Sequence, residues 1–258
     1  MSDTNTALVG RLKELHLPTV RERFEEEAAK ARKASSSFES YLFELMNGEC
    51  EARWQNRIER YLRESRLPLE KSFENFDLAR LPSTVTQHVA VLKEGSFLDR
   101  KENVLAFGNP GSGKTHLLCA IALELVHQGR RVLFTTTALL VEDLLCAKRD
   151  LKLDRFLKRL SKYEALIIDD IGYVQQDREE MEVLFTLLAD RYERASIMLT
   201  SNLPFSKWEL IFKDPMTTAA AIDRLVHHSV ILELNLPSYR LEHSTSKKKS
   251  KKKGGKEI

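Results

Sequence analysis

Apolar residues after position 100 gather in short runs that alternate with segments of helical spacing. Such runs predict strands, and leucines or isoleucines that recur every three or four residues predict helices. The predicted strands are 103–107 (NVLAF), 130–137 (RRVLFTTT), 165–170 (ALIIDD), 196–202 (SIMLTSN) and 229–234 (SVILEL). The predicted helices begin at Lys114 or cover 140–163 and 179–194. Strands that are apolar on both faces and alternate with helices predict an α/β fold, with a parallel sheet between helices and the loops after the strands along one edge.

The N-terminal quarter of the chain shows no strand pattern. It is charged and helix-prone, and its apolar positions favour several short helices. The stretch 66–82, with two prolines and a pair of phenylalanines, is typical of a connection between domains. We therefore expect a small all-helical domain over residues 1–71 and an α/β domain over residues 72–242.

Composition restricts where the protein acts. The formal charge of +3 hides an uneven distribution, because 247–258 holds seven lysines and one glutamate, and the remainder has 34 basic and 37 acidic residues. Residues 243–258 are therefore expected to form a disordered basic tail. No apolar stretch approaches the roughly 18 residues of a membrane span, and the start MSDTNTALVG lacks the pattern of a secretory signal. We expect a cytoplasmic protein with no membrane partner.

The cysteines fit this expectation. Cys50, Cys119 and Cys146 are odd in number and far apart, and none belongs to a Cys-x-x-Cys pair. They are predicted to be reduced and buried.

The loop between the first predicted strand and the helix after it reads GNPGSGKT. Its spacing, Gly-x-x-x-x-Gly-Lys-Thr, is that of a phosphate-binding loop, in which glycines let backbone N–H groups point at phosphate oxygens. Lys114 can reach the β and γ phosphates, and the Thr115 hydroxyl can bind Mg²⁺. The cofactors expected are ATP and Mg²⁺. The residues expected to hold the nucleotide are Gly108, Asn109, Pro110, Gly111, Ser112, Gly113, Lys114, Thr115 and His116.

Two further predicted strands end in polar residues. Asp169 and Asp170 close ALIIDD, where Asp169 is expected to hold Mg²⁺ through water and Asp170 to orient or deprotonate the attacking water. Asn202 ends LTSN, where it could contact the γ phosphate, although a polar strand end before Pro204 is usually an ordinary turn. Lys114, Asp170 and Asn202 are the catalytic candidates from these motifs.

Basic residues repeat at helical spacing within the predicted helix 140–163. They are Lys148, Lys152, Arg155, Arg159 and Lys162, expected on one face, with Leu153, Phe156, Leu157 and Leu160 towards another. Such a stripe suits phosphate contacts with DNA that do not read the base sequence, and a solvated helix face is the alternative. Arg53, Arg57 and Arg60 form a second basic set, and the lysine tail could add salt-sensitive affinity.

The motifs taken together resemble the AAA+ superfamily of P-loop NTPases, and more narrowly the IstB-like insertion-sequence ATP-binding proteins, relatives of the DnaC helicase loaders. The resemblance covers most of the chain and rests on GNPGSGKTHL, ALIIDDIG, LTSNLPFSKW, AAAIDRLVHHSVILELNLPSYR and FENFD at 73–77. It implies a Mg²⁺-dependent ATPase that assembles on duplex DNA with ATP and assists a transposase. By match to AIDRL, it also implies that Arg224 is an arginine finger offered to a neighbouring subunit. Arg240 lies near the place of a further arginine sensor in larger relatives, and we leave it outside the expected site.

Three other functions share the same nucleotide loop. A DnaC-like loader of a replicative helicase would differ in its protein partner. A small-molecule kinase would need a basic lid over both substrates, which the sequence does not show. A nucleotide-dependent binding module would show negligible turnover even with DNA and partner present.

Overall fold

The computed structural model describes residues 3–172, 178–209 and 215–239. The chain divides into two compact units, Met1–Arg60 and Tyr61–Ile258, and the division falls inside a helix. The predicted tail and Arg240 lie outside the described residues. None of the described helices is both long enough and apolar enough to cross a membrane.

The first unit is helical. It contains α1 (Asp3–Glu14), α2 (Pro18–Lys33) and most of α3 (Phe38–Ser65), and its small core is formed by Leu12, Val20, Phe24 and Leu45. The expected short helices are wrong for α3, which runs for 28 residues. This segment contains no proline, and Gly48 is tolerated within the helix, so nothing in the sequence forces a break.

The second unit contains a five-stranded sheet in which every pair is parallel. The strands are β1 (Asn103–Gly108), β2 (Val132–Thr136), β3 (Ala165–Ile171), β4 (Ser196–Ser201) and β5 (Ser229–Leu234). They are ordered β2-β3-β4-β1-β5. The predicted strands and the parallel α/β fold are therefore confirmed.

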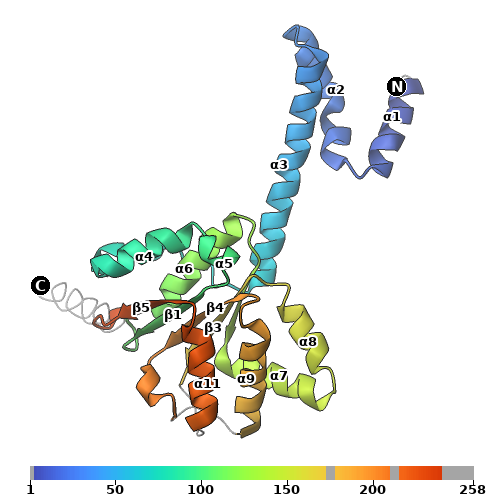
Figure 1. The fold of residues 1–258 in the computed structure, drawn as a ribbon. Helices are drawn as coiled ribbons and strands as arrows, with labels where there is room; N and C mark the ends of the chain where they lie inside the picture. Colours follow the sequence, from blue (N-terminus) through green and yellow to red (C-terminus); the bar gives the residue numbers. More distant parts are fainter. Residues whose placement is uncertain (1–2, 173–177, 210–214, 240–258) are drawn as a thin grey trace, which may run out of the picture. The chain divides into compact units, whose positions relative to one another are not determined.

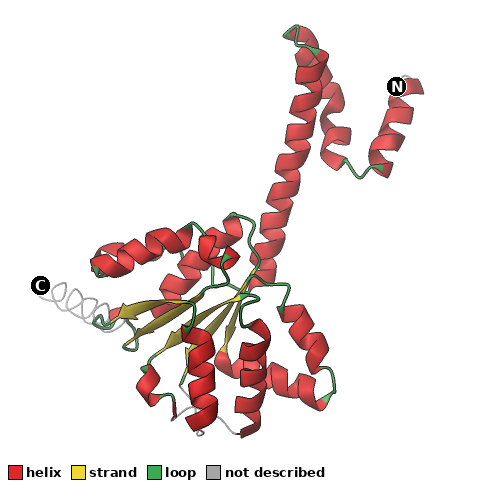
Figure 2. Ribbon diagram, viewed as in Figure 1, coloured by secondary structure: helices red, strands yellow, loops and turns green. Residues whose placement is uncertain are grey.

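Helices cover both faces of this sheet, as Figures 1 and 2 show. One layer is made of α4 (Ser83–Lys93), α5 (Ser96–Asp99) and α6 (Lys114–His127). The other is made of α7 (Thr137–Arg149), α8 (Leu153–Leu160), α9 (Arg178–Arg191) and α11 (Pro215–Val226). Side chains alternate between the two layers along a strand: Val104 and Ala106 pack into the first core, and Leu105 packs into the second. This two-sided burial explains the continuous apolar runs in the sequence.

Parallel pairing brings the carboxyl ends of the strands to one edge. The loop after β1, the aspartates that end β3 and the polar end of β4 meet there, because β1 pairs with β4 and β4 with β3. Open parallel sheets bind ligands at this edge.

The predicted helix 140–163 is wrong, because the structure divides it. Its residues belong to α7 and α8, which are separated by a turn in which Leu151 has a left-handed φ of 57° and is fully exposed. Leu151 takes a conformation that few residues with a side chain adopt, so the sequence gives little warning of the break. Lys148 and Arg155 therefore do not share one helix face.

The cysteines differ in burial. Cys119 on α6 is buried as predicted, and burial raises the pKa of its thiol to about 12. Cys50 and Cys146 are exposed, so the expected burial is wrong for both, because they lie on outward positions of α3 and α7.

Candidate nucleotide site

The loop after β1 depends on its glycines. Gly108, Gly111 and Gly113 have φ values of 149°, 81° and 99°, which residues with a side chain rarely adopt. A Cβ atom on Gly108 would lie 2.2 Å from the backbone oxygen of Leu234 on the neighbouring strand β5. The loop can therefore curl tightly against the sheet only with glycine here, and it leads directly into the N-terminus of α6 at Lys114.

Two polar side chains of this loop, Ser112 and Lys114, are buried. Lys114 is 6% exposed, and its Nζ donates hydrogen bonds to the backbone oxygens of Gly108 (2.8 Å) and Asn109 (3.0 Å). The buried Oγ of Ser112 has no hydrogen-bond partner among the described residues. A buried hydroxyl without a partner, an ammonium group and the positive end of α6 all favour an anionic ligand such as a phosphate chain.

Thr115, Asp169 and Thr200 form a hydrogen-bonded cluster where α6, β3 and β4 meet. The hydroxyls of Thr115 and Thr200 both donate to Oδ1 of Asp169, at 2.8 and 2.6 Å. The carboxylate is 7% exposed. Oxygen atoms of hydroxyls and carboxylates are the ligands that Mg²⁺ prefers, so Thr115 and Asp169 fit a magnesium site. Thr200 is a residue that sequence reasoning treated only as part of a strand end.

Asp170 lies beside this cluster but faces the solvent. Its backbone N–H donates to the Thr200 hydroxyl at 2.8 Å, and its φ is 61°. The β3–β4 register shifts between Ile168 and Ile171, a bulge of the kind that redirects side chains near active sites. Asp170 and Asn202 consequently line the same cavity as the phosphate-binding loop.

This cavity has a volume of about 350 Å³, within the usual range for small-molecule sites. The predicted residues that line it are Pro110, Gly111, Ser112, Gly113, Lys114, Thr115, His116, Asp170 and Asn202. Gly108, Asn109 and Asp169 do not line it, although each bonds to a residue that does.

Seven further lining residues are not among the predicted site residues, although five of them lie within FENFD or the final NLPSYR of the quoted motifs. They are Lys71, Asn75, Phe76, Asp77, Arg80, Leu236 and Tyr239. The segment 66–82 is thus more than a connection between domains. Its paired phenylalanines could have indicated that this segment packs against the second unit, because exposed aromatic residues in a plain linker would have no packing partner.

Two aromatic contacts organise this side of the cavity. The ring of Phe76 packs edge-on against His116, with centroids 5.1 Å apart, and His116 Nε2 lies 2.9 Å from the Ser72 oxygen. The Arg80 guanidinium lies 5.1 Å from the centre of the Tyr239 ring, and the Tyr239 N–H donates to the Gly111 oxygen at 3.0 Å. The residues before β1 and those after β5 therefore both reach the phosphate-binding loop.

Arg224 lies elsewhere in the fold. It is on α11, where Nη1 donates to the Ala220 oxygen at 3.0 Å and the guanidinium stacks 4.7 Å from the centre of the Phe185 ring on α9. Of the described residues, those lining the nucleotide cavity do not include Arg224. It is therefore not a ligand of this chain's own cavity.

Most of the predicted basic stripe gathers along a separate groove of about 610 Å³ beside α8. The groove is lined by Lys152, Arg155, Arg159 and Lys162, together with Lys158, which lies outside the predicted stripe. Lys148 does not line it and instead forms an ion pair with Glu182 on α9, at 3.0 Å. The single stripe of five residues is thus replaced by a basic groove that excludes Lys148.

The second basic set is partly used inside the first unit. Arg53 bonds to Glu49 and to the His16 backbone oxygen, while Arg57 stacks on Trp54, with 5.7 Å between the guanidinium and the ring centre. Arg53 therefore joins α3 to the turn between α1 and α2, and Arg57 packs on its own helix.

Comparisons with known proteins agree with this site. Residues 10–247 match the family described as IstB-like ATP binding protein. An insertion sequence ATP-binding protein of Sinorhizobium fredii is 43% identical over 230 residues, which cover 89% of this chain and 77% of that protein. The IS21 ATP-binding protein of Pseudomonas aeruginosa is 40% identical and covers 91% of this chain and 88% of its own length.

Solved structures share the fold at lower identity. A crystal structure of the DnaC helicase loader has a TM-score of 0.52 at 18% identity, covering 67% of this chain and 98% of the loader. The AMPPCP-bound DnaA of Aquifex aeolicus has a TM-score of 0.56 at 20% identity, covering 72% of this chain and 57% of DnaA. These likenesses show a fold shared with the DnaC loader and DnaA. With the matched family spanning both units and the phosphate-binding loop, the chain belongs to the IstB-like ATP-binding proteins.

Proposed function

We propose that this protein is a Mg²⁺-dependent ATPase that assembles on duplex DNA with ATP and assists a transposase during insertion-sequence transposition. The observation that carries the proposal is the Thr115–Asp169–Thr200 cluster beside the phosphate-binding loop, with Asp170 and Asn202 lining the same cavity. A module that only binds nucleotide needs the loop, whereas hydrolysis also needs a carboxylate near the attacking water.

Each residue has a role that follows from its position. Lys114 and the loop N–H groups bind the phosphates. Thr115 and Asp169 hold Mg²⁺, whose charge offsets that of the phosphates. Thr200 fixes the Asp169 carboxylate and the Asp170 backbone.

The hydrolytic step uses the exposed carboxylate. Asp170 orients a water molecule and accepts its proton as the oxygen attacks the γ phosphorus. The bond from that phosphorus to the bridging oxygen breaks, giving ADP and phosphate. Asn202, which lines the same cavity, donates to the γ phosphate and so distinguishes ATP from ADP.

Arg224 acts on a second subunit in this proposal. Because it does not line its own chain's cavity, its guanidinium could act as an arginine finger only on the nucleotide of a neighbour. The neighbour's γ phosphate would draw subunits together, and hydrolysis would then dismantle the assembly. Asp170→Asn should accordingly leave the protein locked on DNA.

The basic groove beside α8 is the proposed DNA surface. Five lysines and arginines line it, against Asp143 and Asp150. This excess of positive charge suits contacts with phosphates, which confer affinity without sequence preference.

The insertion-sequence function is favoured over a helicase loader by the relatives. Those at 37–43% identity over most of the chain carry insertion-sequence names, whereas the DnaC and DnaI structures are 18% and 22% identical and share only the fold. The transposase is therefore the first partner to test.

Sedimentation with labelled duplex DNA tests the assembly. Large complexes should form with Mg²⁺ and ATP but not with ADP, and both Lys114→Ala and Arg224→Ala should fail to form them. Arg100→Ala is the matched control, since this half-exposed arginine pairs with Glu102 and has no part in the proposal. A protein that binds ATP yet stays monomeric and ignores DNA would contradict the DNA function. Phosphate release near background with DNA and transposase present would contradict the ATPase.

A further inference from the structure

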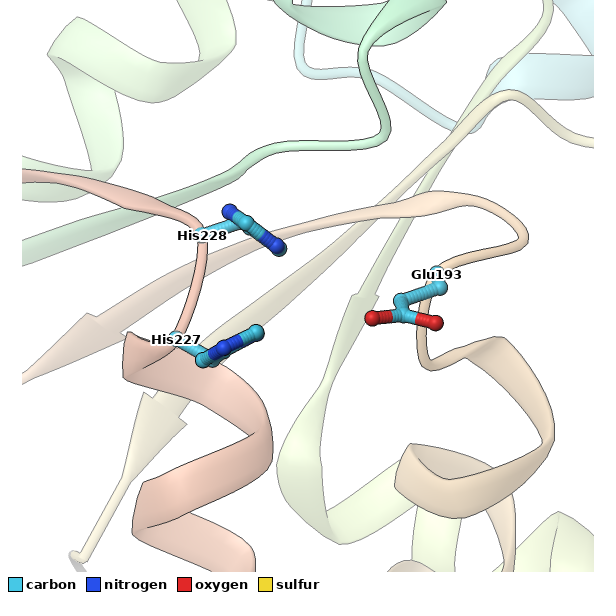
Figure 3. A group of neighbouring side chains, drawn as sticks. All are labelled: Glu193, His227 and His228. Atoms are coloured by element: carbon cyan, nitrogen blue, oxygen red, sulfur yellow. The ribbon is translucent and has the colours of Figure 1, made fainter.

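Three exposed side chains outside the nucleotide cavity bring metal-binding atoms together. Glu193 lies in the turn between α9 and β4, and His227 and His228 lie in the turn between α11 and β5 (Figure 3). One ligand atom from each residue lies within 4.8 Å of those from the other two. Both turns precede strands, so the cluster lies at the amino edge of the sheet, opposite the phosphate-binding loop.

We propose that Glu193, His227 and His228 bind a zinc ion. Two imidazoles and one carboxylate form a donor set found in zinc sites that keep a fourth position open. Ligand atoms around a tetrahedral zinc ion lie about 3.3 Å apart, given bonds of about 2.0–2.1 Å. The three side chains therefore need to approach one another by about 1.5 Å at most, which exposed side chains achieve by rotating about their own bonds.

Tyr192 supports one of the three ligands. Its hydroxyl lies 3.1 Å from Nδ1 of His227. Nε2 is therefore the nitrogen of that ring that would bind zinc. A hydrogen bond of this kind orients a ligand of a metal.

The site would connect two helices that are also joined by Arg224. An ion bound by Glu193 and His227 would link the end of α9 to the end of α11. Arg224 lies three residues before His227 and stacks on Phe185 of α9. If Arg224 serves a neighbouring subunit, as proposed above, zinc would restrict the helix end that presents it. Zinc binding itself is independent of that function.

The test is a zinc titration of the full chain without a histidine tag, in competition with a chromogenic chelator and without ATP or DNA. Cys50→Ser and Cys146→Ser are introduced first, because both thiols are exposed and could bind zinc. We expect one ion per chain. His227→Ala and His228→Ala should each weaken binding at least about tenfold, since even outer ligand partners contribute about 10–100-fold. Glu193→Gln should weaken it as well.

His88→Ala is the matched control, because this exposed histidine on α4 lies outside the cluster and should leave binding unchanged. Zinc should also raise the melting temperature of the parent chain but not that of the His227→Gln, His228→Gln double variant, whose fold is checked by circular dichroism. Equal zinc affinity in the parent and the double variant, or no stoichiometric binding by the parent, would overturn the proposal.

Discussion

Thr115 and Asp169, which are 54 positions apart in the sequence, are joined by a hydrogen bond of 2.8 Å from the threonine hydroxyl to the carboxylate. This contact fixes the first turn of α6 to the end of β3. Thr200 donates to the same carboxylate oxygen and ties the end of β4 to it. The proposed magnesium ligands are thus positioned by one helix, α6, and two strands, β3 and β4.

Thr200→Val should reduce ATP turnover by about 10–100-fold, as loss of an outer partner does at metal sites. Valine has nearly the same shape but cannot donate to Asp169 or accept from the Asp170 N–H. Nucleotide affinity should change less, because the phosphate-binding loop is intact. Phosphate release and equilibrium binding of a fluorescent ATP analogue measure the two effects. Thr186→Val, at a half-buried site on α9 whose hydroxyl donates to the Glu182 oxygen, should match the parent, and an equal loss in both variants would refute the role of Thr200.

Gly108→Ala should destabilise the second unit by about 1–3 kcal/mol through backbone strain and abolish ATP binding. The added Cβ would lie 2.2 Å from the Leu234 oxygen, so either β5 or the loop must move. Gly10→Ala on α1 is the control, since no atom lies within 4 Å of its Cβ, and helix propensity predicts a small stabilisation there. Calorimetric unfolding would show the difference. An unchanged melting temperature for Gly108→Ala would contradict the predicted clash.

Glu49 should make the first unit sensitive to acid. Burial opposes ionisation of this carboxyl, but hydrogen bonds from Arg53 and from the N–H groups of Val20 and Thr19 outweigh it and lower its pKa below 4.5. Because the folded pKa is lower than the unfolded one, the stabilisation is present above the unfolded pKa and is lost as pH falls through the folded pKa.

The effect can be measured by following helix content of the full chain between pH 7 and pH 3. Glu49→Gln should remove much of the pH dependence in this range and lower stability at pH 7, because the N-terminus of α2 loses a charged acceptor. Glu14→Gln, on the exposed end of α1, is the control. Identical acid profiles for the parent and Glu49→Gln would show that Glu49 is not the cause of the acid sensitivity.

Arg191→Lys should destabilise the second unit by about 1–3 kcal/mol, the cost of leaving buried acceptors unpaired. The buried guanidinium donates to the backbone oxygens of Leu160, Tyr163 and Ser196, and burial lowers its pKa to about 10. An ammonium group cannot reproduce this fork. Arg194→Lys, at a largely exposed site, should have little effect on urea unfolding. Equal unfolding midpoints would show that the three bonds contribute nothing.

Arg155→Ala should reduce the salt dependence of DNA binding. If its side chain neutralises one phosphate, the slope of log K against log[salt] should fall by about 0.9. Fluorescence anisotropy with duplexes of unrelated sequence measures the slope and should show the same change in each. Lys101→Ala, outside the groove, should keep the parental slope. If the Arg155→Ala, Lys158→Ala double variant kept the parental slope, the basic groove beside α8 would not be the DNA surface.

The strands could be predicted from the sequence because their burial on two faces leaves a continuous apolar pattern. The end of α7 could not be predicted, because Asp150 and Leu151 continue the helical spacing and neither position is a glycine or a proline. Only the packing of α8 against the sheet, helped by the bonds of Arg191, shows why the chain turns there.

The candidate site was predictable where its residues are close in sequence. Local spacing identified Lys114 and Thr115, and strand ends identified Asp169 and Asp170. The hydrogen bond from Arg80 to the Pro237 oxygen joins residues that are 157 positions apart. Local spacing in the sequence does not predict such a contact. That part of the cavity required the three-dimensional structure.

Binding of a ligand in the nucleotide cavity also reports whether the second unit is complete. Residues before the first strand and after the last strand both contribute to it, through Arg80 and Tyr239. A ligand bound there stabilises only chains in which both ends have reached their native positions. A chain ending before Leu236 would keep every residue of the phosphate-binding loop and yet lack one wall of the cavity. Nucleotide retention can therefore serve as a quality check for intact second units, where a test for the loop sequence alone cannot.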